Sequence, residues 1–391
     1  MKKQYYYGRQ YLDHEDWNEC LKVLKSDYLS QGPILEKFES TVAKYFEVNY
    51  CVAVSSATAA LHLGCRALGI NEGDTVWTTS LSFVATANAI RYCGAKVEFI
   101  DIDDRSLNLS IKQLNERLKD AKSKGTLPKA VIPVHFAGQP CEMGEIKKLS
   151  KTYSFKILED ASQAMGATYN DTKIGECKYS DITVFSLHPV KSITTGEGGL
   201  ILTNSEDIYM QALSERAHGI EKNNSDKSTP PWVAEMLSEG FNYKITEIQC
   251  SLGLTQLKKL KKFIVKRNRL SSLYRDLMKG LPVTLQEGND NSNSAWHLMV
   301  LRFDFESLGI KKDVFYNYMK EKGINLSLHY YPIHLHSFYR NLGFKIGSLP
   351  NTENYYEQAF TFPLHVSLED KDVKFICSQI KSLIGNNNGK K

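Results

Sequence analysis

The stretch CVAVSSATAALHLGCRAL, residues 51–68, predicts the fold more clearly than any other part of the chain. Residues 51–54 form an apolar run typical of a buried β-strand. The small polar residues 55–58 that follow are typical of a helix start, and residues 59–68 continue with helix-forming alanine and leucine. A strand that leads directly into a capped helix is the first half of a βαβ unit.

The same alternation of short apolar runs and helical patterns continues on both sides of this stretch. Further strands are predicted at residues 74–78, 95–100, 130–134, 155–158, 182–186 and 199–203. Beyond them, residues 247–281 predict a long helix, residues 295–300 a strand, and residues 314–322 and 373–383 two more helices. This order predicts an α/β fold with a central, mostly parallel sheet. We expect a large domain over residues 1–250 and a small C-terminal α+β domain over residues 251–391.

Composition and charge exclude several classes of protein. With 391 residues, 42% hydrophobic and 24% charged, the chain has the apolar content of a globular protein and not of a disordered one. A net charge of +5 over 391 residues is too small for a typical nucleic-acid-binding protein, and at most it helps to attract an anionic small molecule. No apolar run reaches the roughly 18 residues that a membrane span needs. Eight isolated cysteines without a C-x-x-C pair indicate a reducing compartment and no zinc site. We therefore expect a cytoplasmic protein that binds neither nucleic acid, membrane nor metal.

Two residues in the middle of the chain have the chemistry that pyridoxal 5′-phosphate (PLP) requires. Asp160 ends a predicted strand, and Lys191 follows thirty-one positions later in a loop of small residues. A lysine amine can bind the aldehyde of PLP as a Schiff base, and a carboxylate can keep the pyridine nitrogen protonated. The helix start at residues 55–58 offers N–H groups to a phosphate. Alone, each element is more often a turn residue, a surface lysine or a plain cap, but the combination favours PLP.

The residues around this pair resemble a known enzyme family. The runs EDASQAMGA (159–167), FSLHPVKSITTGEGG (185–199) and FNYKITEIQ (241–249) closely resemble the DegT/DnrJ/EryC1/StrS family of PLP-dependent sugar aminotransferases. Shorter runs at residues 29–33, 80–88 and 134–138 extend the resemblance over nearly the whole chain. It implies the fold of type I PLP-dependent transferases, which is the aspartate aminotransferase fold, and a homodimer with shared active sites.

The resemblance also assigns expected roles around the cofactor. Lys191 would be the catalytic lysine that holds PLP and then moves a proton, and Asp160 would pair with the pyridine nitrogen. Phe83 would stack on the ring, and Gln163 would lie near its phenolate edge. The remaining cofactor-binding residues would contact the phosphate, Asn242 doing so in the partner subunit: Ser56, Ala57, Thr58, Ser186 and Asn242. No role is assigned to Glu197.

For the reaction, the resemblance implies amino transfer from L-glutamate, through pyridoxamine phosphate, to a nucleotide-linked 4-keto-6-deoxy sugar. Residues 134–138, 186–188 and 328–334 are most similar to the pseudaminic acid branch. Those enzymes aminate C4 of a UDP-linked 4-keto-6-deoxy-N-acetylhexosamine and form UDP-4-amino-4,6-dideoxy-N-acetyl-β-L-altrosamine. The N-terminal segment 1–33 would contribute to the sugar-nucleotide pocket. The expected pocket residues are Tyr6, Tyr7, Leu29, Ser30, Gln31, Gly32, His188, His329, Tyr330, Tyr331 and Pro332.

Three alternatives stay open at this stage. The acceptor could be another 4-keto-6-deoxy sugar linked to UDP, dTDP or GDP. The chain could be a sugar dehydratase on the same fold, although members of that subgroup replace the lysine with histidine and Lys191 is present here. It could also be a binding protein without catalysis, a reading that an intact pair of Asp160 and Lys191 disfavours.

Overall fold

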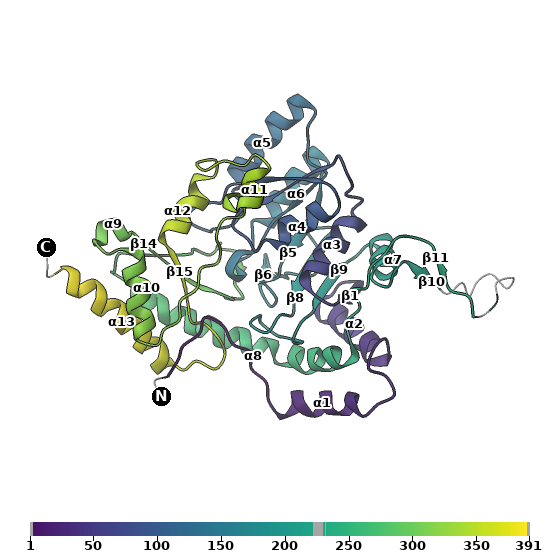
Figure 1. Ribbon diagram of the computed structural model, residues 1–391, viewed down its shortest axis with the longest axis horizontal. Helices are drawn as coiled ribbons and strands as arrows, with labels where there is room; N and C mark the ends of the chain where they lie inside the picture. The colour runs from purple at the N-terminus through teal and green to yellow at the C-terminus, as the bar shows by residue number, and fades with distance from the viewer. Residues whose placement is uncertain (1–2, 222–229, 231, 389–391) are drawn as a thin grey trace.

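A seven-stranded sheet forms the centre of the protein, whose computed structural model describes residues 3–221, 230 and 232–388 (Figure 1). In spatial order the strands are β1 (Tyr50–Val54), β9 (Gly199–Thr203), β8 (Ile182–Ser186), β5 (Lys156–Asp160), β4 (Ala130–Ile132), β2 (Thr75–Thr79) and β3 (Lys96–Ile100). The five strands from β8 to β3 are parallel, whereas β9 is antiparallel to both its neighbours. The predicted α/β fold with a mostly parallel sheet is confirmed.

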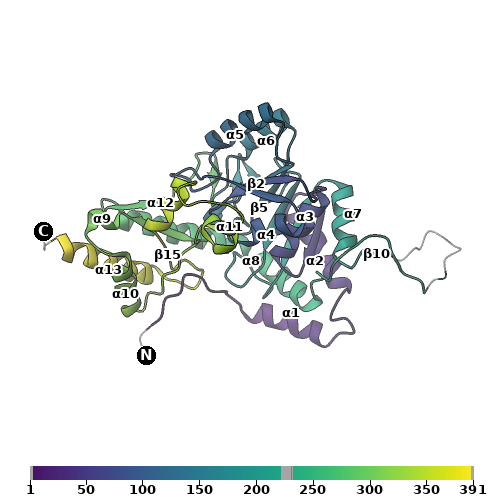
Figure 2. The same cartoon turned by 45° about the horizontal axis from the view of Figure 1, so that its top comes forward.

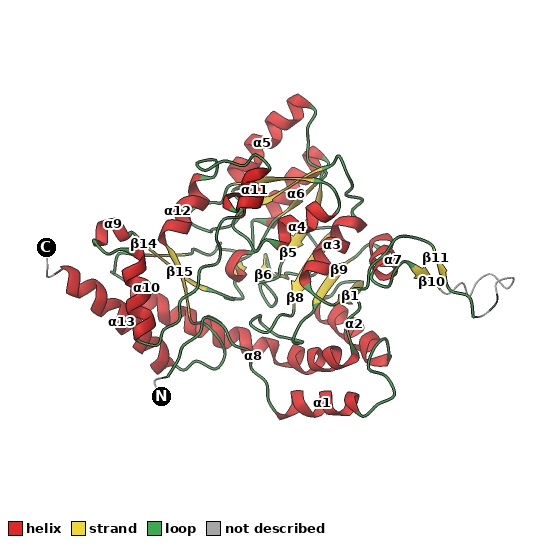
Figure 3. Ribbon diagram, viewed as in Figure 1, coloured by secondary structure: helices red, strands yellow, loops and turns green. Residues whose placement is uncertain are grey.

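Helices cover both faces of this sheet, as Figure 3 shows. One apolar cluster joins the sheet to α2 (Pro33–Phe46), α5 (Ile111–Lys124), α6 (Met143–Tyr153) and the first half of α8 (Glu247–Met278). A second cluster joins it to α3 (Ala57–Ala67), α4 (Ala85–Tyr92) and α7 (Glu206–Glu215). Consecutive side chains of a strand point to opposite faces. For this reason Ile157 of β5 packs in the first cluster and Leu158 in the second.

The long helix α8 connects the sheet to the C-terminal part of the chain (Figure 2). Thr246 caps its start by accepting from the backbone N–H of Gln249, and the side-chain oxygen of Gln249 accepts from the backbone N–H of Thr246. Near its end, Leu270 and Tyr274 pack in a third apolar cluster with the C-terminal strands and helices. Because α8 is continuous across residue 250, the division into two domains at that position stays a prediction.

The C-terminal part contains a small antiparallel sheet of β12 (Val283–Leu285), β14 (Met299–Phe303) and β15 (Ala359–Phe362). The strand predicted at residues 295–300 was wrongly placed, since β14 begins only at Met299. Trp296 has a positive φ of 41°, and the backbone N–H of His297 donates to the carbonyl of Ala137, 2.8 Å away. Residues 295–298 are therefore drawn onto a loop of the large sheet instead of extending β14.

The remaining elements surround these two sheets. They are α1 (His14–Leu24), α9 (Phe305–Leu308), α10 (Lys312–Glu321), α11 (Ser337–Asn341), α12 (Pro350–Gln358), α13 (Asp370–Asn388), the 3₁₀ turns Phe136–Gly138 and Ile333–Leu335, and the short strands β6 (Thr168–Tyr169), β7 (Thr172–Lys173), β10 (Ile220–Glu221), β11 (Glu235–Met236) and β13 (Ser292–Asn293). Within the described residues, none of these helices combines the length and the apolar character needed to cross a membrane.

Candidate active site

A cavity of about 570 Å³ lies where the carboxyl ends of the central strands meet the start of α3. Open parallel sheets bind their ligands at this edge. Twelve of the residues predicted from the sequence line it: Tyr7, Ser56, Ala57, Thr58, Phe83, Asp160, Gln163, Ser186, His188, Lys191, His329 and Tyr330. A larger hollow of about 840 Å³ lies between α1, α2 and α8, but none of the predicted cofactor-binding residues lines it. The candidate chemistry is therefore gathered in the smaller cavity.

Asp160 is the last residue of β5, and its buried carboxylate is held by two donors. The hydroxyl of Thr86 on α4 donates to Oδ2 over 2.6 Å, and the backbone N–H of Ser162 donates to Oδ1 over 3.1 Å. Thr86 is fixed in turn by the Ser82 hydroxyl, 2.8 Å away. These contacts fix the direction of the carboxylate at the cavity wall.

Lys191 lies in the loop between β8 and β9, and its side chain reaches the same cavity. Among the described residues no hydrogen bond or ion pair to its amine is found. Burial lowers the pKa of Lys191 to about 8, against the opposing effect of the negative charges of Asp160 and Glu197. A partly buried, unpaired amine with a lowered pKa is the state that a nucleophilic lysine needs.

This lowered pKa predicts how the cofactor-free protein takes up PLP. Only the neutral amine attacks an aldehyde, and with a pKa of about 8 the neutral fraction of Lys191 grows as the pH rises through 8. We expect the rate of PLP uptake to rise about tenfold per pH unit below 8 and to level off above it. Stopped-flow absorbance, corrected with free Nα-acetyl-lysine as reference, measures this rate. A plateau reached only near the usual lysine value of 10.5 would contradict it.

The start of α3 provides a cradle for an anion. Ser56 caps the helix by accepting from the backbone N–H of Ala59 over 3.1 Å, which leaves the N–H groups of Ala57 and Thr58 at the first turn. A Cβ at Gly199 would lie only 2.4 Å from the Ser56 carbonyl, so only glycine lets β9 pack this closely against the helix start. Together with Lys191, this cradle fits the phosphate and aldehyde ends of PLP.

Three histidines surround Lys191, and all three are held neutral. Burial, reinforced by the charge of Lys191, lowers the pKa of His329 to about 3 and that of His297 well below its usual range. Burial is also the main cause that lowers the pKa of His188, which lies 3.9 Å from Glu197. These side chains therefore offer hydrogen bonds to a ligand and add no positive charge at neutral pH.

An aromatic wall closes the other side of the cavity. The rings of Tyr7 and His329 lie 4.6 Å apart between centroids, and those of Phe83 and Tyr330 lie 5.9 Å apart. The amide of Gln163 donates to the Tyr330 hydroxyl over 2.8 Å. Phe83 is 57% exposed, so its ring is free to stack on a bound ligand.

Eight other predicted residues do not line this cavity: Tyr6, Leu29, Ser30, Gln31, Gly32, Asn242, Tyr331 and Pro332. The segment 29–32 lies beside the start of α8, where the Gly32 N–H donates to the Glu247 carboxylate over 3.0 Å. Asn242 pairs with Ala217 in an isolated antiparallel bridge. Within one chain these eight residues therefore lie outside the cavity lining, and their roles in the site stay predictions.

Further residues line the cavity that had no role assigned from the sequence. Three of them, Thr86, Ser82 and Glu197, occur in the runs that carry the family resemblance. Their position in these motifs, and not their spacing, was the signal that could have identified them as site residues. His297 had no such signal. It reaches the cavity because residues 295–298 attach to the loop at Ala137.

Comparisons with known proteins agree with this geometry. The model of the DegT/DnrJ/EryC1/StrS aminotransferase family matches residues 10–381. The UDP-4-amino-4,6-dideoxy-N-acetyl-beta-L-altrosamine transaminase of Campylobacter jejuni is 36% identical over 97% of each chain. The spore coat polysaccharide biosynthesis protein SpsC of Bacillus subtilis is 33% identical over 97% of this chain and 96% of its own. Among solved structures, Helicobacter pylori PseC, an aminotransferase involved in pseudaminic acid biosynthesis, has a TM-score of 0.90 at 29% identity and covers 98% of this chain and 100% of its own.

Proposed function

The chain belongs to the DegT/DnrJ/EryC1/StrS aminotransferase family, whose members use PLP to aminate sugars, and on that premise we propose a specific reaction. The amino group of L-glutamate is transferred to C4 of a UDP-linked 4-keto-6-deoxy-N-acetylhexosamine. The product is UDP-4-amino-4,6-dideoxy-N-acetyl-β-L-altrosamine. The family fixes the kind of chemistry, whereas the sugar, the nucleotide and the donor are the proposed parts.

The observation that carries the proposal is the meeting of Lys191, Asp160 and the start of α3 in one cavity. PLP, when bound, supplies an electron sink that stabilises negative charge on the carbon losing a proton. The Asp160 carboxylate would hold the proton on the pyridine nitrogen. The N–H groups of Ala57 and Thr58, with Ser186, would bind the phosphate. Each role is a proposal supported by the position of the group in the cavity.

Lys191 would act twice in this scheme. Its neutral amine would hold the cofactor, and its Nζ, once released, would be the group that accepts and returns a proton in the cavity. The pKa of about 8 suits a group that must both accept and give a proton near neutral pH. The neutral histidines His188 and His329 and the aromatic ring of Tyr7 would contact the sugar, which is polar but uncharged.

The identity of the acceptor is supported by the name of the altrosamine transaminase, which is that of the proposed product, and by PseC, an aminotransferase involved in pseudaminic acid biosynthesis. The test is to incubate the purified protein with PLP, L-glutamate and a panel of 4-keto sugar nucleotides. Mass spectrometry and NMR then identify each product. Formation of the 4-amino altrose-configured UDP sugar is expected. Exclusive use of a dTDP- or GDP-linked sugar, or loss of water without amino transfer, would contradict the proposal.

We also propose that the protein works as a homodimer whose active sites are shared. Asn242 and residues 29–32 lie away from the cavity of their own chain, which is what residues serving the partner's site would do. In a symmetric dimer each such residue occurs once in each site.

A mixture of two inactive variants tests this sharing. If Asn242 serves the partner's site, Lys191→Ala and Asn242→Ala place both defects in one site of a mixed dimer and leave the other site intact. After unfolding and refolding together in equal amounts, about a quarter of the wild-type activity should return. Each variant refolded alone is the control. No recovery in the mixture, with dimers formed, would show that the site is not shared.

A further inference from the structure

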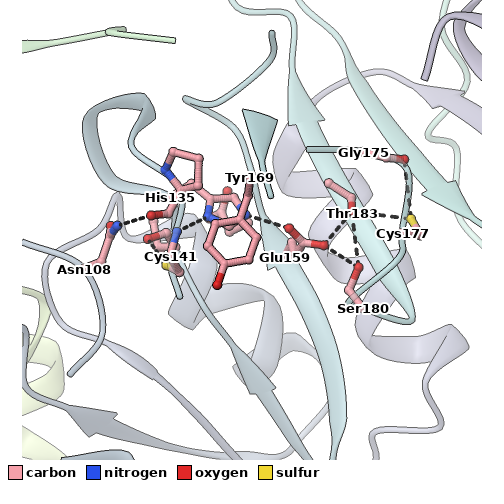
Figure 4. Close-up of polar contacts among 12 residues, drawn as sticks. Asn108, His135, Cys141, Glu159, Tyr169, Gly175, Cys177, Ser180 and Thr183 are labelled. Carbon is pink, nitrogen blue, oxygen red and sulfur yellow. Dashed lines mark hydrogen bonds and ion pairs between the residues drawn. The ribbon is translucent and has the colours of Figure 1, made fainter. Parts of the chain in front are cut away.

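A buried acid and histidine lie behind β5, on the face opposite to the cavity, and the mechanism above does not use them. His135 Nε2 lies 2.7 Å from a carboxylate oxygen of Glu159, and the two residues are 0% and 3% exposed (Figure 4). Glu159 directly precedes Asp160 in β5, so their side chains point to opposite faces of the sheet. Neither His135 nor Glu159 lines the cavity.

The hydrogen bonds of this pair are complete. The Glu159 carboxylate also accepts from the hydroxyls of Ser180 and Thr183, at 2.5 and 3.1 Å. His135 Nδ1 accepts from the backbone N–H of Cys141 over 3.0 Å, so the other ring nitrogen carries the proton that is donated to Glu159. Figure 4 shows these groups joined into one network between β5, β8 and the loop after β4. A buried carboxylate is tolerated only with such a set of donors.

The loop that carries His135 is attached to two residues of the cavity wall. The backbone N–H of His135 donates to the Asp160 carbonyl over 3.1 Å. Two residues further along, the backbone N–H of Ala137 likewise donates to the side-chain oxygen of Gln163 over 2.6 Å. The other end of that amide donates to Tyr330. Any shift of the loop therefore moves Asp160 and Gln163 together.

We propose that the pair of His135 and Glu159 positions Asp160 and Gln163 for cofactor binding by holding this loop against β5. Both residues are positioning residues, because they touch neither ligand nor reacting atoms. The inference rests on the proposed function only in that PLP is the ligand. Stability alone does not explain the pair, because a buried ion pair or charged hydrogen bond contributes little more than apolar residues of the same volume. A fixed geometry is what the polar pair adds.

Glu159→Gln tests this role by removing the charge at nearly constant volume. The control is Asp16→Asn in α1, since Asp16 is 0% exposed and also accepts from three side chains, but it lines no wall of the cavity. We expect Glu159→Gln to raise the dissociation constant of the cofactor-free protein for PLP about tenfold or more. Asp16→Asn should lower the melting temperature by about as much as Glu159→Gln does and change that dissociation constant by less than about twofold. Fluorescence titration with PLP alone measures the dissociation constants of both variants.

A second pair of variants covers a failure of Glu159→Gln to fold. The double variant His135→Leu/Glu159→Leu removes both partners and leaves no stranded charge, so it should fold with weak PLP binding. The single variant His135→Gln keeps a donor for Glu159. It should therefore retain part of the PLP affinity that Glu159→Gln and the double variant lose. Unchanged PLP affinity in Glu159→Gln or in the double variant would overturn the positioning role. The titration contains no sugar, so its result does not depend on the proposed acceptor. If Glu159→Gln weakens PLP binding as expected but the wild-type protein aminates no sugar nucleotide of the panel, only the proposed reaction is wrong.

Discussion

Lys191→Ala should lower turnover by about 10⁴-fold or more and abolish the visible absorbance of lysine-bound PLP. Among the described residues that line the cavity, Lys191 is the only lysine. Water can replace it neither as anchor nor as proton carrier, so both signals should disappear together. Steady-state assays and absorbance spectra of the purified variant measure the two effects.

Lys148→Ala is a suitable control for this variant. Lys148 is an exposed lysine of α6 whose side chain is 74% accessible and pairs with Glu145. Its removal should leave both the spectrum and the turnover unchanged. A Lys191→Ala protein with near-normal turnover would remove the basis of the assigned chemistry.

Asp160→Asn should lower turnover by about 10² to 10⁴-fold while the protein still binds PLP. The amide keeps the size of the side chain and can still accept from Thr86, but it has no charge to hold a proton on the pyridine nitrogen. Transfer from glutamate and transfer to the sugar both need that proton. Single-turnover measurements with glutamate alone should therefore show the defect in the first half of the reaction.

Thr86→Val separates the charge of Asp160 from its orientation. The valine removes the hydroxyl that donates to Oδ2 but leaves the carboxylate charged. The loss of one hydrogen bond to a charged group is worth at least about 1.5 kcal/mol, which predicts a decrease in turnover of roughly tenfold or more. An equal decrease in Thr86→Val and Asp160→Asn would show that the charge itself is unimportant.

Much of the sheet and of the site was predictable because its signals are local. Asp160 follows an apolar strand, Lys191 lies in a loop of small residues, and Ser56 begins a helix, and each of these patterns can be read within ten residues. The fold then gathers them, because parallel strands end at the same edge of a sheet.

The rest depends on contacts between distant parts of the chain. The bond between Thr86 and Asp160 joins residues 74 positions apart, and that between Gln163 and Tyr330 joins residues 167 apart. No periodicity encodes either bond. The misplaced start of β14 has the same origin, since residues 295–298 are drawn to Ala137 by tertiary hydrogen bonds that override their strand pattern.

Transfer of the labelled amino group of ¹⁵N-glutamate tests the central claim most directly. The purified protein is incubated with PLP, ¹⁵N-glutamate and the UDP-linked 4-keto-6-deoxy-N-acetylhexosamine, and the product is examined by NMR and mass spectrometry. The account predicts ¹⁵N bonded to C4 of the sugar, with one 2-oxoglutarate formed for each sugar aminated, and neither product with Lys191→Ala. A sugar product without ¹⁵N, or labelled product formed equally well by Lys191→Ala, would contradict it.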